Sequence, residues 1–400
     1  MPWKEVKPMN QKLRFISDYL NGYFSITELC SRFGISRTIG YKWINRYQTS
    51  GRPDALFDLS RRPHHSPKKT ADEIVQALLD VRDKHPFWGP RKLLCLVADK
   101  HPDWVLPAES TVALILKRNG YIKSKRKRIK RYHPGRPLTV MTRPNEVWTA
   151  DFKGHFKTLD GLYCYPLTIA DGYSRYLFSI DSMLAPLQKP VKTVFKRLFE
   201  EYGLPDKIRT DNGNPFATVA LGRLSRLSAW WIRLGIIPEL IEPGCPEQNG
   251  RHERMHKTLK YETTIPPAAN LRKQQKRFDG FLQEFNNVRP HEALGMKPPV
   301  KVYRPSPKKL PSHLPPIEYP SHYELRRVSK NCGIRWKHKR VCVSQVLAGE
   351  YVGLEEIDDG VWDMYYGPVW LGRFFEKLMK IEDDKGKLQR HYFKKKDGKV

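Results

Sequence analysis

The sequence has few cysteines, no long apolar run and comparatively few acidic residues. Its six cysteines are scattered over 400 residues without a C-x-x-C pair, which argues against structural zinc and a disulfide framework and favours free thiols. No run of about 18 apolar residues could span a bilayer, and residues 1–10 lack the apolar core of a signal peptide. These absences predict a soluble, cytoplasmic chain that does not enter a membrane.

Positive charge dominates what is present. Lys and Arg number 72 against 42 Asp and Glu, which gives a formal net charge of +30 at pH 7. An excess of this size, spread over most of the chain, indicates a polyanionic partner. Nucleic acid is the first candidate, and an anionic membrane surface is the rival. With 40% hydrophobic residues the chain can form several cores, so we expect several domains.

Residues 1–50 have the pattern of an α-helical helix-turn-helix domain. Ser25 and Ser36 are each placed to cap a helix, and Gly34 ends the first of these two helices. Apolar side chains at helical spacing on the second helix are expected to face inward: Ile39, Trp43, Ile44 and Tyr47. Polar side chains of the same helix are expected to face outward and to contact the DNA major groove: Arg37, Thr38, Tyr41, Lys42 and Asn45. A three-helix bundle without a DNA role is the alternative.

A second helical domain is predicted at 70–121, after a linker at 51–69. Pro90 opens one of its helices and Ser110 is placed to cap another. It has the pattern of a second helix-turn-helix, although such units also serve as packing domains. A basic linker follows at 122–140, where a block without acids is expected to follow a DNA backbone: Lys123, Lys125, Arg126, Lys127 and Arg128.

From residue 141 the pattern changes to that of a mixed α/β sheet. Short apolar runs predict strands at 147–156, 162–169, 175–180, 207–210 and 236–241. Amphipathic patterns predict helices at 190–202, 221–234 and 271–286, with a further helix that begins near Gly250. This core is expected to span 141–297.

The C-terminal part combines proline with short strands. Eight prolines between 298 and 320 predict a semi-rigid linker at 298–322. Closely spaced β-rich runs then predict a small all-β barrel at 323–400. This barrel could contact DNA or be purely structural.

Three acidic residues stand out in the central domain. Asp151 lies inside a predicted strand, Asp211 lies at the carboxyl end of another, where α/β sheets place ligands, and Glu253 lies in the helix after the last strand. Carboxylates from separate segments can converge and hold two divalent ions for an in-line phosphodiester displacement. Such oxygen ligands suit Mg²⁺ or Mn²⁺. The alternative for Glu253 is an ordinary charge on a solvated helix face.

These acids stand in motifs that resemble the DDE integrase core. The motifs are Trp148-Thr149-Ala150-Asp151-Phe152, Thr210-Asp211-Asn212-Gly213 and Gln248-Asn249-Gly250-Arg251-His252-Glu253, and Asn287-Val288-Arg289-Pro290-His291 is similar to the segment that closes the core in this family. The family, which has an RNase H-like fold, includes bacterial insertion-sequence transposases and retroviral integrases. The helix-turn-helix pair resembles the insertion-sequence branch.

The third acid of the motif has two candidates. The family is named for about 35 residues between its second Asp and the Glu, and 35 residues separate Asp211 from Glu247, whereas 41 separate it from Glu253. In the family motif, however, the Glu lies inside the helix three residues after a Gly, which is the relation of Glu253 to Gly250. Lys257 and Lys260 share the helix face of Glu253, where they could bind substrate DNA. We therefore select Glu253.

The resemblance implies a DNA transposase. Such a chain binds the terminal inverted repeats of its mobile element and performs metal-dependent strand cleavage and strand transfer, with Asp151, Asp211 and Glu253 as catalytic residues and ligands of two Mg²⁺ or Mn²⁺ ions. Its partners would be element-end and target DNA and further copies of itself, and it would be associated with the bacterial nucleoid. A catalytically inactive DNA-binding regulator is the alternative from another class, and a structure-specific nuclease is a third possibility.

Overall fold

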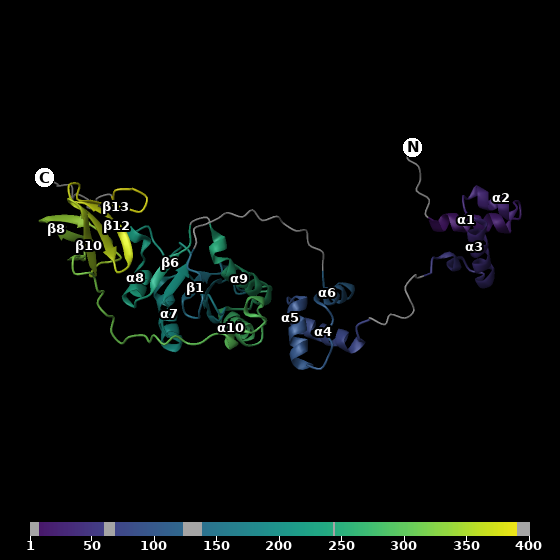
Figure 1. The fold of residues 1–400 in the computed structure, drawn as a ribbon, viewed down its shortest axis with the longest axis horizontal. Helices are drawn as coiled ribbons and strands as arrows, with labels where there is room; N and C mark the ends of the chain where they lie inside the picture. Colours follow the sequence, from purple (N-terminus) through teal and green to yellow (C-terminus); the bar gives the residue numbers. More distant parts are fainter. Residues whose placement is uncertain (1–7, 60–68, 123–137, 243–244, 390–400) are drawn as a thin grey trace. The chain divides into compact units, whose positions relative to one another are not determined.

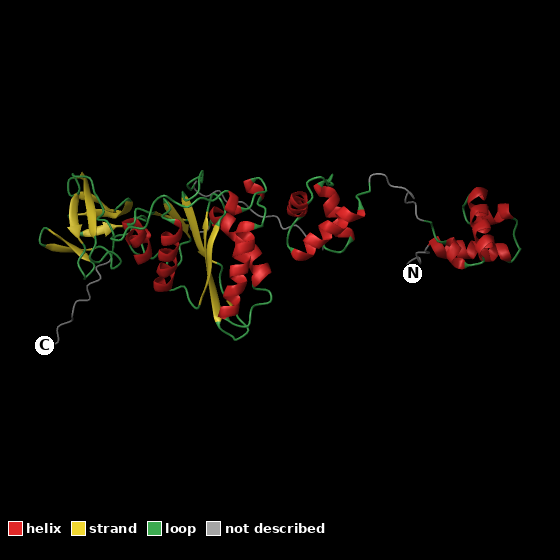
Figure 2. Cartoon of the chain, turned by 90° about the horizontal axis from the view of Figure 1, so that it is seen from below, coloured by secondary structure: helices red, strands yellow, loops and turns green. Residues whose placement is uncertain are grey.

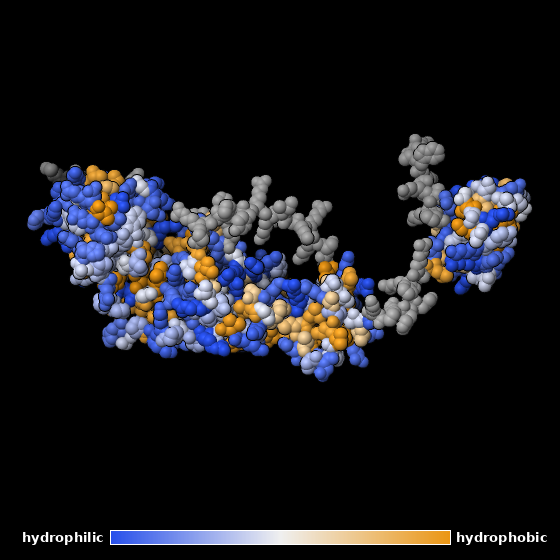
Figure 3. Space-filling view, in the orientation of Figure 1, coloured by the Kyte–Doolittle hydropathy of each residue, from blue (hydrophilic) through white to orange (hydrophobic). Residues whose placement is uncertain are grey.

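The computed structural model describes residues 8–59, 69–122, 138–242 and 245–389, without the side chains of Pro8, Pro246 and Glu247. The chain divides into two compact units, residues 1–70 and 71–400 (Figure 1). Within the described residues, no helix is long and apolar enough to cross a membrane. The face drawn in Figure 3 is largely hydrophilic, with apolar patches between the charged areas.

The first unit contains three helices and a short 3-10 turn. Their bounds are α1 Pro8–Leu20, α2 Ile26–Arg32, α3 Arg37–Ser50 and η1 Pro53–Leu56. Ser25 forms a reciprocal capping box with Glu28, and the Ser36 side chain accepts a hydrogen bond from the backbone of Ile39, so both predicted caps are confirmed. The expectation that the Ile39 side chain faces inward is wrong, because it is 44% exposed. The packed face of α3 instead runs through Gly40, Trp43 and Ile44.

The second unit begins with another group of three helices. Their bounds are α4 Asp72–Lys84, α5 Pro90–Lys100 and α6 Glu109–Arg118. They enclose a small core around Leu78, Trp88, Leu93 and Val112. The predicted cap at Ser110 is wrong, because α6 begins at Glu109, two residues earlier than such a cap requires, and its N-cap is Ala108, which provides no side-chain hydrogen bond.

The central domain has a mixed sheet and four α-helices. Its elements are β1 Val147–Phe152, β2 Phe156–Lys157, β3 Tyr163–Asp171, β4 Leu177–Met183, α7 Gln188–Tyr202, β5 Lys207–Thr210, η2 Leu221–Arg223, α8 Arg226–Arg233, β6 Ile237–Leu240, η3 Pro246–Asn249, α9 Gly250–Thr263 and α10 Leu271–Asn287. The sheet order is β2-β3-β1-β5-β6, with β4 also paired to β3. Pairing is antiparallel through β4, β3 and β1, and parallel from β1 to β5 and β6. The predicted mixed α/β sheet is confirmed.

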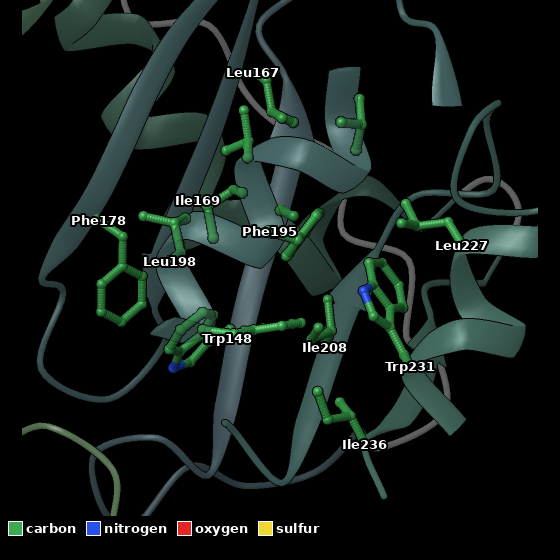
Figure 4. Packing of buried hydrophobic residues seen from close by; sticks show 14 of the residues in the cluster. Trp148, Leu167, Ile169, Phe178, Phe195, Leu198, Ile208, Leu227, Trp231 and Ile236 are labelled. Atoms are coloured by element: carbon green, nitrogen blue, oxygen red, sulfur yellow. The ribbon is translucent and has the colours of Figure 1, made fainter. Parts of the chain in front are cut away.

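Helices cover both faces of this sheet (Figure 2). On one face α7 and α8 pack a cluster that includes Trp148, Phe195 and Trp231 (Figure 4). On the other face Met255 of α9 and Phe281 of α10 pack against β3 and β4. Because β1 lies between these two layers, its side chains alternate between two buried environments.

The predicted C-terminal barrel is not confirmed by the strands that the structure describes. Their bounds are β7 Glu324–Arg327, β8 Gly333–Trp336, β9 Lys339–Cys342, β10 Tyr351–Asp358, β11 Val361–Tyr366, β12 Val369–Phe375 and β13 Lys380–Glu382. Within the described residues the sheet β13-β12-β11-β10-β7 is open, and β8 and β9 form a separate hairpin. The physical reason is that the core of this sheet is completed by other residues, including Leu221 and Ile232 of the central domain.

The 3-10 turn before α8 lies close to strand β12 of the C-terminal sheet. The predicted single helix at 221–234 is divided, because Gly222 has φ of 61° and ends the 3-10 turn before α8 begins. A Cβ on Gly222 would lie 2.9 Å from Leu371 of β12, so only glycine allows this close approach. Part of the segment between Asp211 and α9 therefore packs against the C-terminal sheet.

Candidate active site

Asp151 comes from the central strand of the sheet. It stands near the end of β1 opposite Thr168 of β3, and its side chain is 18% exposed. Burial, together with the negative charges of Asp211 and Glu253, raises the pKa of Asp151 to about 7. The three predicted acids are therefore close enough to interact, although they come from three separate elements.

Asp211 directly follows β5, the parallel neighbour of β1. The backbone N–H of Gly213 donates to its Oδ1 at 3.1 Å, and the side chain of Asn212 donates to the carbonyl of Ile241 at 2.6 Å. A Cβ on Gly213 would lie 3.0 Å from Asp211 Oδ2, so glycine leaves the space that the carboxylate occupies. Burial raises the pKa of Asp211 above its usual range.

Glu253 lies in the first turn of α9 and is exposed. Just before this helix, Asn249 Nδ2 donates to Asp151 Oδ2 at 3.4 Å, which links the start of α9 to β1. Lys257 and Lys260 are exposed on the same helix. Because the side chain of Glu247 lies outside the described residues, the structure provides geometry for Glu253 alone.

Two histidines of α9 lie beneath this site. His252 and His256 are 3% and 6% exposed, so both rings are buried. Their Nε2 atoms lie 2.6 and 2.7 Å from Thr168 Oγ1, and this hydroxyl lies 3.0 Å from the Asp151 carbonyl oxygen. Burial lowers the pKa of His252 to about 3 and that of His256 to about 2, so both rings are neutral near pH 7.

Lys153 is a residue of this site that the motifs did not indicate. Burial lowers its pKa, and the nearby charge of Lys260 lowers it further, while the charge of Asp151 acts in the opposite direction. Lys153 therefore lies near both the carboxylate and the basic face of α9. Strand alternation could have identified it, because residues two apart on a strand share a face.

Comparison with known families identifies the domain that carries these residues. Models described as "Integrase core domain" match residues 141–246 and 234–299. A "Helix-turn-helix domain" model matches residues 11–64, and a "Homeodomain-like domain" model matches residues 39–116. Residues 141–299 form an integrase core domain.

Proteins similar to this chain include insertion-element proteins. The chain is 26% identical over 264 residues to an uncharacterized protein of insertion element IS476 from Xanthomonas euvesicatoria, which covers 62% of this chain and 70% of that protein. It is 28% identical to the IS407 protein of Burkholderia multivorans over 40% of this chain and 56% of that protein. The Gag-Pol polyprotein of baboon endogenous virus is 27% identical over 47% of this chain but only 10% of its own length. The predicted resemblance to insertion-element proteins and retroviral integrases is confirmed.

Solved structures similar to this chain are retroviral. The HTLV-2 integrase catalytic core domain in complex with magnesium is 16% identical, with a TM-score of 0.30, and covers 40% of this chain and 98% of that chain. The simian T-cell lymphotropic virus intasome in complex with a PP2A regulatory subunit is 16% identical, with a TM-score of 0.35, and covers 73% of this chain and 97% of that chain. The integrase core is therefore identified from the family models and the insertion-element proteins.

The donor chemistry of the integrase core fits a hard divalent cation. Asp151, Asp211 and Glu253 offer oxygen ligands, which Mg²⁺ and Mn²⁺ prefer. Among the residues that the structure describes, no three His, Cys, Asp or Glu side chains lie close enough together to hold one metal ion.

The remaining predicted DNA-binding residues lie outside the integrase core. Those of α3 are all exposed, as expected for a face that contacts DNA: Arg37, Thr38, Tyr41, Lys42 and Asn45. Ile39 is exposed beside them. The predicted basic block falls outside the described residues: Lys123, Lys125, Arg126, Lys127 and Arg128.

Proposed function

We propose that this chain is a DNA transposase that binds the terminal inverted repeats of a mobile element and catalyses metal-dependent strand cleavage and strand transfer. One observation carries the proposal: within an integrase core, the charges of Asp211 and Glu253 act on a half-buried Asp151. Carboxylates that raise the pKa of a buried neighbouring acid are costly to keep beside it, and a phosphodiester-processing site is a physical reason to do so.

Asp151, Asp211 and Glu253 would hold the cation, with two Mg²⁺ or Mn²⁺ ions per site. Bound there, the ions would activate the attacking oxygen and stabilise the leaving oxygen of an in-line displacement. The protein fixes the direction of Asp151 through Asn249 and the buried pair of His256 and Thr168.

Cations at the rim of the site would hold the substrate. Lys257 and Lys260 are exposed on α9, and Lys153 lies near Lys260. Ammonium groups in these positions can bind the phosphates that flank the scissile bond, which orients the strand toward the carboxylates.

The helical parts would read the DNA. We propose that α3 enters the major groove of the element end and that the basic block at 123–128 follows the backbone. Acting on two ends at once requires at least a dimer on DNA. We also propose the domain boundaries 1–50, 70–121, 141–297 and 323–400, joined by linkers.

The test uses purified full-length protein and duplexes from the DNA that flanks the gene. Asp151→Asn and Asp211→Asn proteins should bind an end duplex like the wild type but show no Mg²⁺-dependent cleavage. Asp160→Asn is the matched control, since Asp160 is an exposed turn residue and its loss should leave cleavage unchanged. Cleavage by either site variant would contradict the proposal, and a wild-type protein that binds without cleaving would support the regulator instead.

A further inference from the structure

A second basic site lies beside α9 in the unit 71–400. A cleft of about 650 Å³ is enclosed by the turn between β3 and β4, the first turns of α9, the segment after α10 and one side chain of α5. Asp151, Asp211 and Glu253 are not among its lining residues. Six lining side chains are cationic: Lys92, Arg175, Arg251, Arg254, Lys257 and Arg289.

The two acids that line this cleft, Asp171 and Glu292, offset its six cations only in part. Asp171 already accepts three hydrogen bonds of 2.6 to 2.7 Å at its two carboxylate oxygens. Glu292 is paired with Arg91. His252 and His291 also line the cleft, but burial lowers the pKa of each to about 3, so neither ring carries charge at neutral pH. The cleft is therefore strongly positive.

Most of its cations have no ionic partner. Arg289 pairs with Glu262 at 3.1 Å, but within the described ranges no ion pair involves Arg175, Arg251, Arg254 or Lys257. Burial, together with the charges of Arg251 and Arg254, lowers the pKa of Arg175 to about 10. Cations that are crowded and partly dehydrated without a counter-charge are costly, and a bound anion would remove this cost.

The backbone supplies an independent observation. Arg175 has φ of 65°, a left-handed conformation that few residues other than glycine adopt. Its N–H donates to the carbonyl of Asp171 at 3.1 Å, which holds it in the β3–β4 turn. A strained conformation at a long cationic side chain is a reason to seek a function for it.

We propose that this cleft binds the phosphodiester backbone of a DNA strand, on a face of α9 different from that of Glu253. Guanidinium groups match phosphate oxygens in a two-pronged geometry, and three of the lining arginines gather here without ion pairs. Lys257 lies one turn after Glu253 and also lines the cleft. A DNA strand that leaves the carboxylates can therefore pass Lys257 and enter the cleft. The choice of DNA as the source of the phosphate rests on the proposed function.

The experiment places a photo-crosslinker in the cleft of the full-length protein. Thr258 is half-exposed and lines the cleft, so p-benzoylphenylalanine at this position should crosslink to an end duplex in EDTA, where cleavage cannot occur. In the protein that carries this crosslinker, the double substitution Arg175→Gln with Arg254→Gln should reduce crosslinking by about tenfold. It should also reduce the slope of log affinity against log salt by about 2. Arg254→Gln alone should reduce crosslinking by a smaller factor. Because Arg254 is exposed, this single change should leave the fold intact, so its effect cannot be attributed to misfolding.

The matched control is Arg272→Gln with Lys273→Gln, two exposed cations of α10 that do not line the cleft. This pair should leave Thr258 crosslinking unchanged. Equal crosslinking by the cleft and control variants would overturn the proposal. Titration with inorganic phosphate and with deoxythymidine monophosphate tests whether the cleft binds a small phosphate instead of DNA. Binding of either compound that depends on the cleft arginines, without crosslinking to DNA, would also overturn the proposal.

The two proposals fail separately. An Asp211→Asn protein should crosslink from position 258 like the wild type while showing no cleavage. Cleavage by the Asp211→Asn protein would contradict the proposed function, but it would not affect the crosslinking measured in EDTA. If the protein with the crosslinker at position 258 fails to crosslink to DNA while the wild-type protein cleaves normally, only the assignment of the cleft is contradicted.

Discussion

The imidazole of His256 contacts Asp151 from beneath: Nδ1 lies 3.7 Å from Asp151 Oδ2, and Nε2 of the same ring lies 2.7 Å from Thr168 Oγ1. Burial lowers the pKa of His256 to about 2, so the ring is neutral and does not compensate the carboxylate charge. The separation of 3.7 Å exceeds a hydrogen bond, so we expect the ring to limit the directions open to Asp151 by packing beside it.

Removal of this contact should weaken metal binding. His256→Leu is expected to raise the Mg²⁺ concentration for half-maximal cleavage by about 10- to 100-fold, as for other supports of metal ligands. His256→Asn keeps a polar group and should lose less. End-duplex cleavage measured against Mg²⁺ concentration checks this. An unchanged Mg²⁺ dependence in the Leu variant would show that the contact has no orienting role.

Metal binding should also depend on pH. Because burial and the neighbouring carboxylates raise the pKa of Asp151 to about 7, protons compete with the cation below that pH. The half-saturating Mg²⁺ concentration should increase by about tenfold for each pH unit below 7 and level off above it. Equal values at pH 6 and pH 8 would contradict this expectation.

The buried histidines should make the fold sensitive to acid. Unfolded histidine binds a proton near pH 6.5, whereas burial lowers the pKa of His252 to about 3 in the folded state. The unfolded state therefore binds more protons between these values, and the stability that the neutral ring contributes is lost as pH falls through this window. Asp151 has the opposite effect on stability, because its pKa is raised in the folded state from 3.8 to about 7. Between these values the folded state binds more protons, so the contribution of Asp151 becomes more favourable as pH falls.

His252→Gln should flatten this dependence. Urea unfolding midpoints at pH 7 and pH 5 are the measurement, and the wild type should lose more stability than the variant between them. The effect of one ring is at most about 1.4 kcal/mol per pH unit. A variant with the same loss as the wild type would contradict the assignment of a neutral buried ring.

Lys92 should reduce the stability of the protein. Burial lowers its pKa to about 8, with a further contribution from the charge of Arg289. The unfolded state holds the proton up to about pH 10.5, so the cost of the charge is full below pH 8 and disappears as pH rises between these values. Lys92→Met should therefore raise the thermal midpoint at pH 7, and the difference should shrink by pH 10. Lys100→Met, at an exposed residue of the same helix, should change it little at either pH.

Local patterns predicted the core well. Apolar runs at 147–156 and 207–210 and the turn before Gly250 correspond to β1, β5 and the start of α9. These elements position the three predicted acids, and the sheet order that brings them together is the usual one for alternating strands and helices. The helical pattern of α9 does not reveal that His252 and His256 are buried against Thr168 of β3, because that strand is distant in the sequence.

Contacts between distant segments account for the other errors. The open C-terminal sheet completes its core with Ile232 and Leu221, and no periodicity within 323–400 could reveal that partner. Ile39 fits the helical spacing of an inward residue, but the packing of Gly40 against α1 and α2 rotates it outward. The basic cleft likewise joins four segments that are remote in the sequence.

The central claim is tested most directly by single-turnover cleavage of an end duplex in Mg²⁺ by Glu253→Gln and by Glu247→Gln proteins. We predict that Glu253→Gln lowers the cleavage rate by at least about two orders of magnitude, as expected for the loss of a group that acts on the reacting atoms, while Glu247→Gln stays near the wild-type rate. Full cleavage by Glu253→Gln, with loss in Glu247→Gln, would contradict the account.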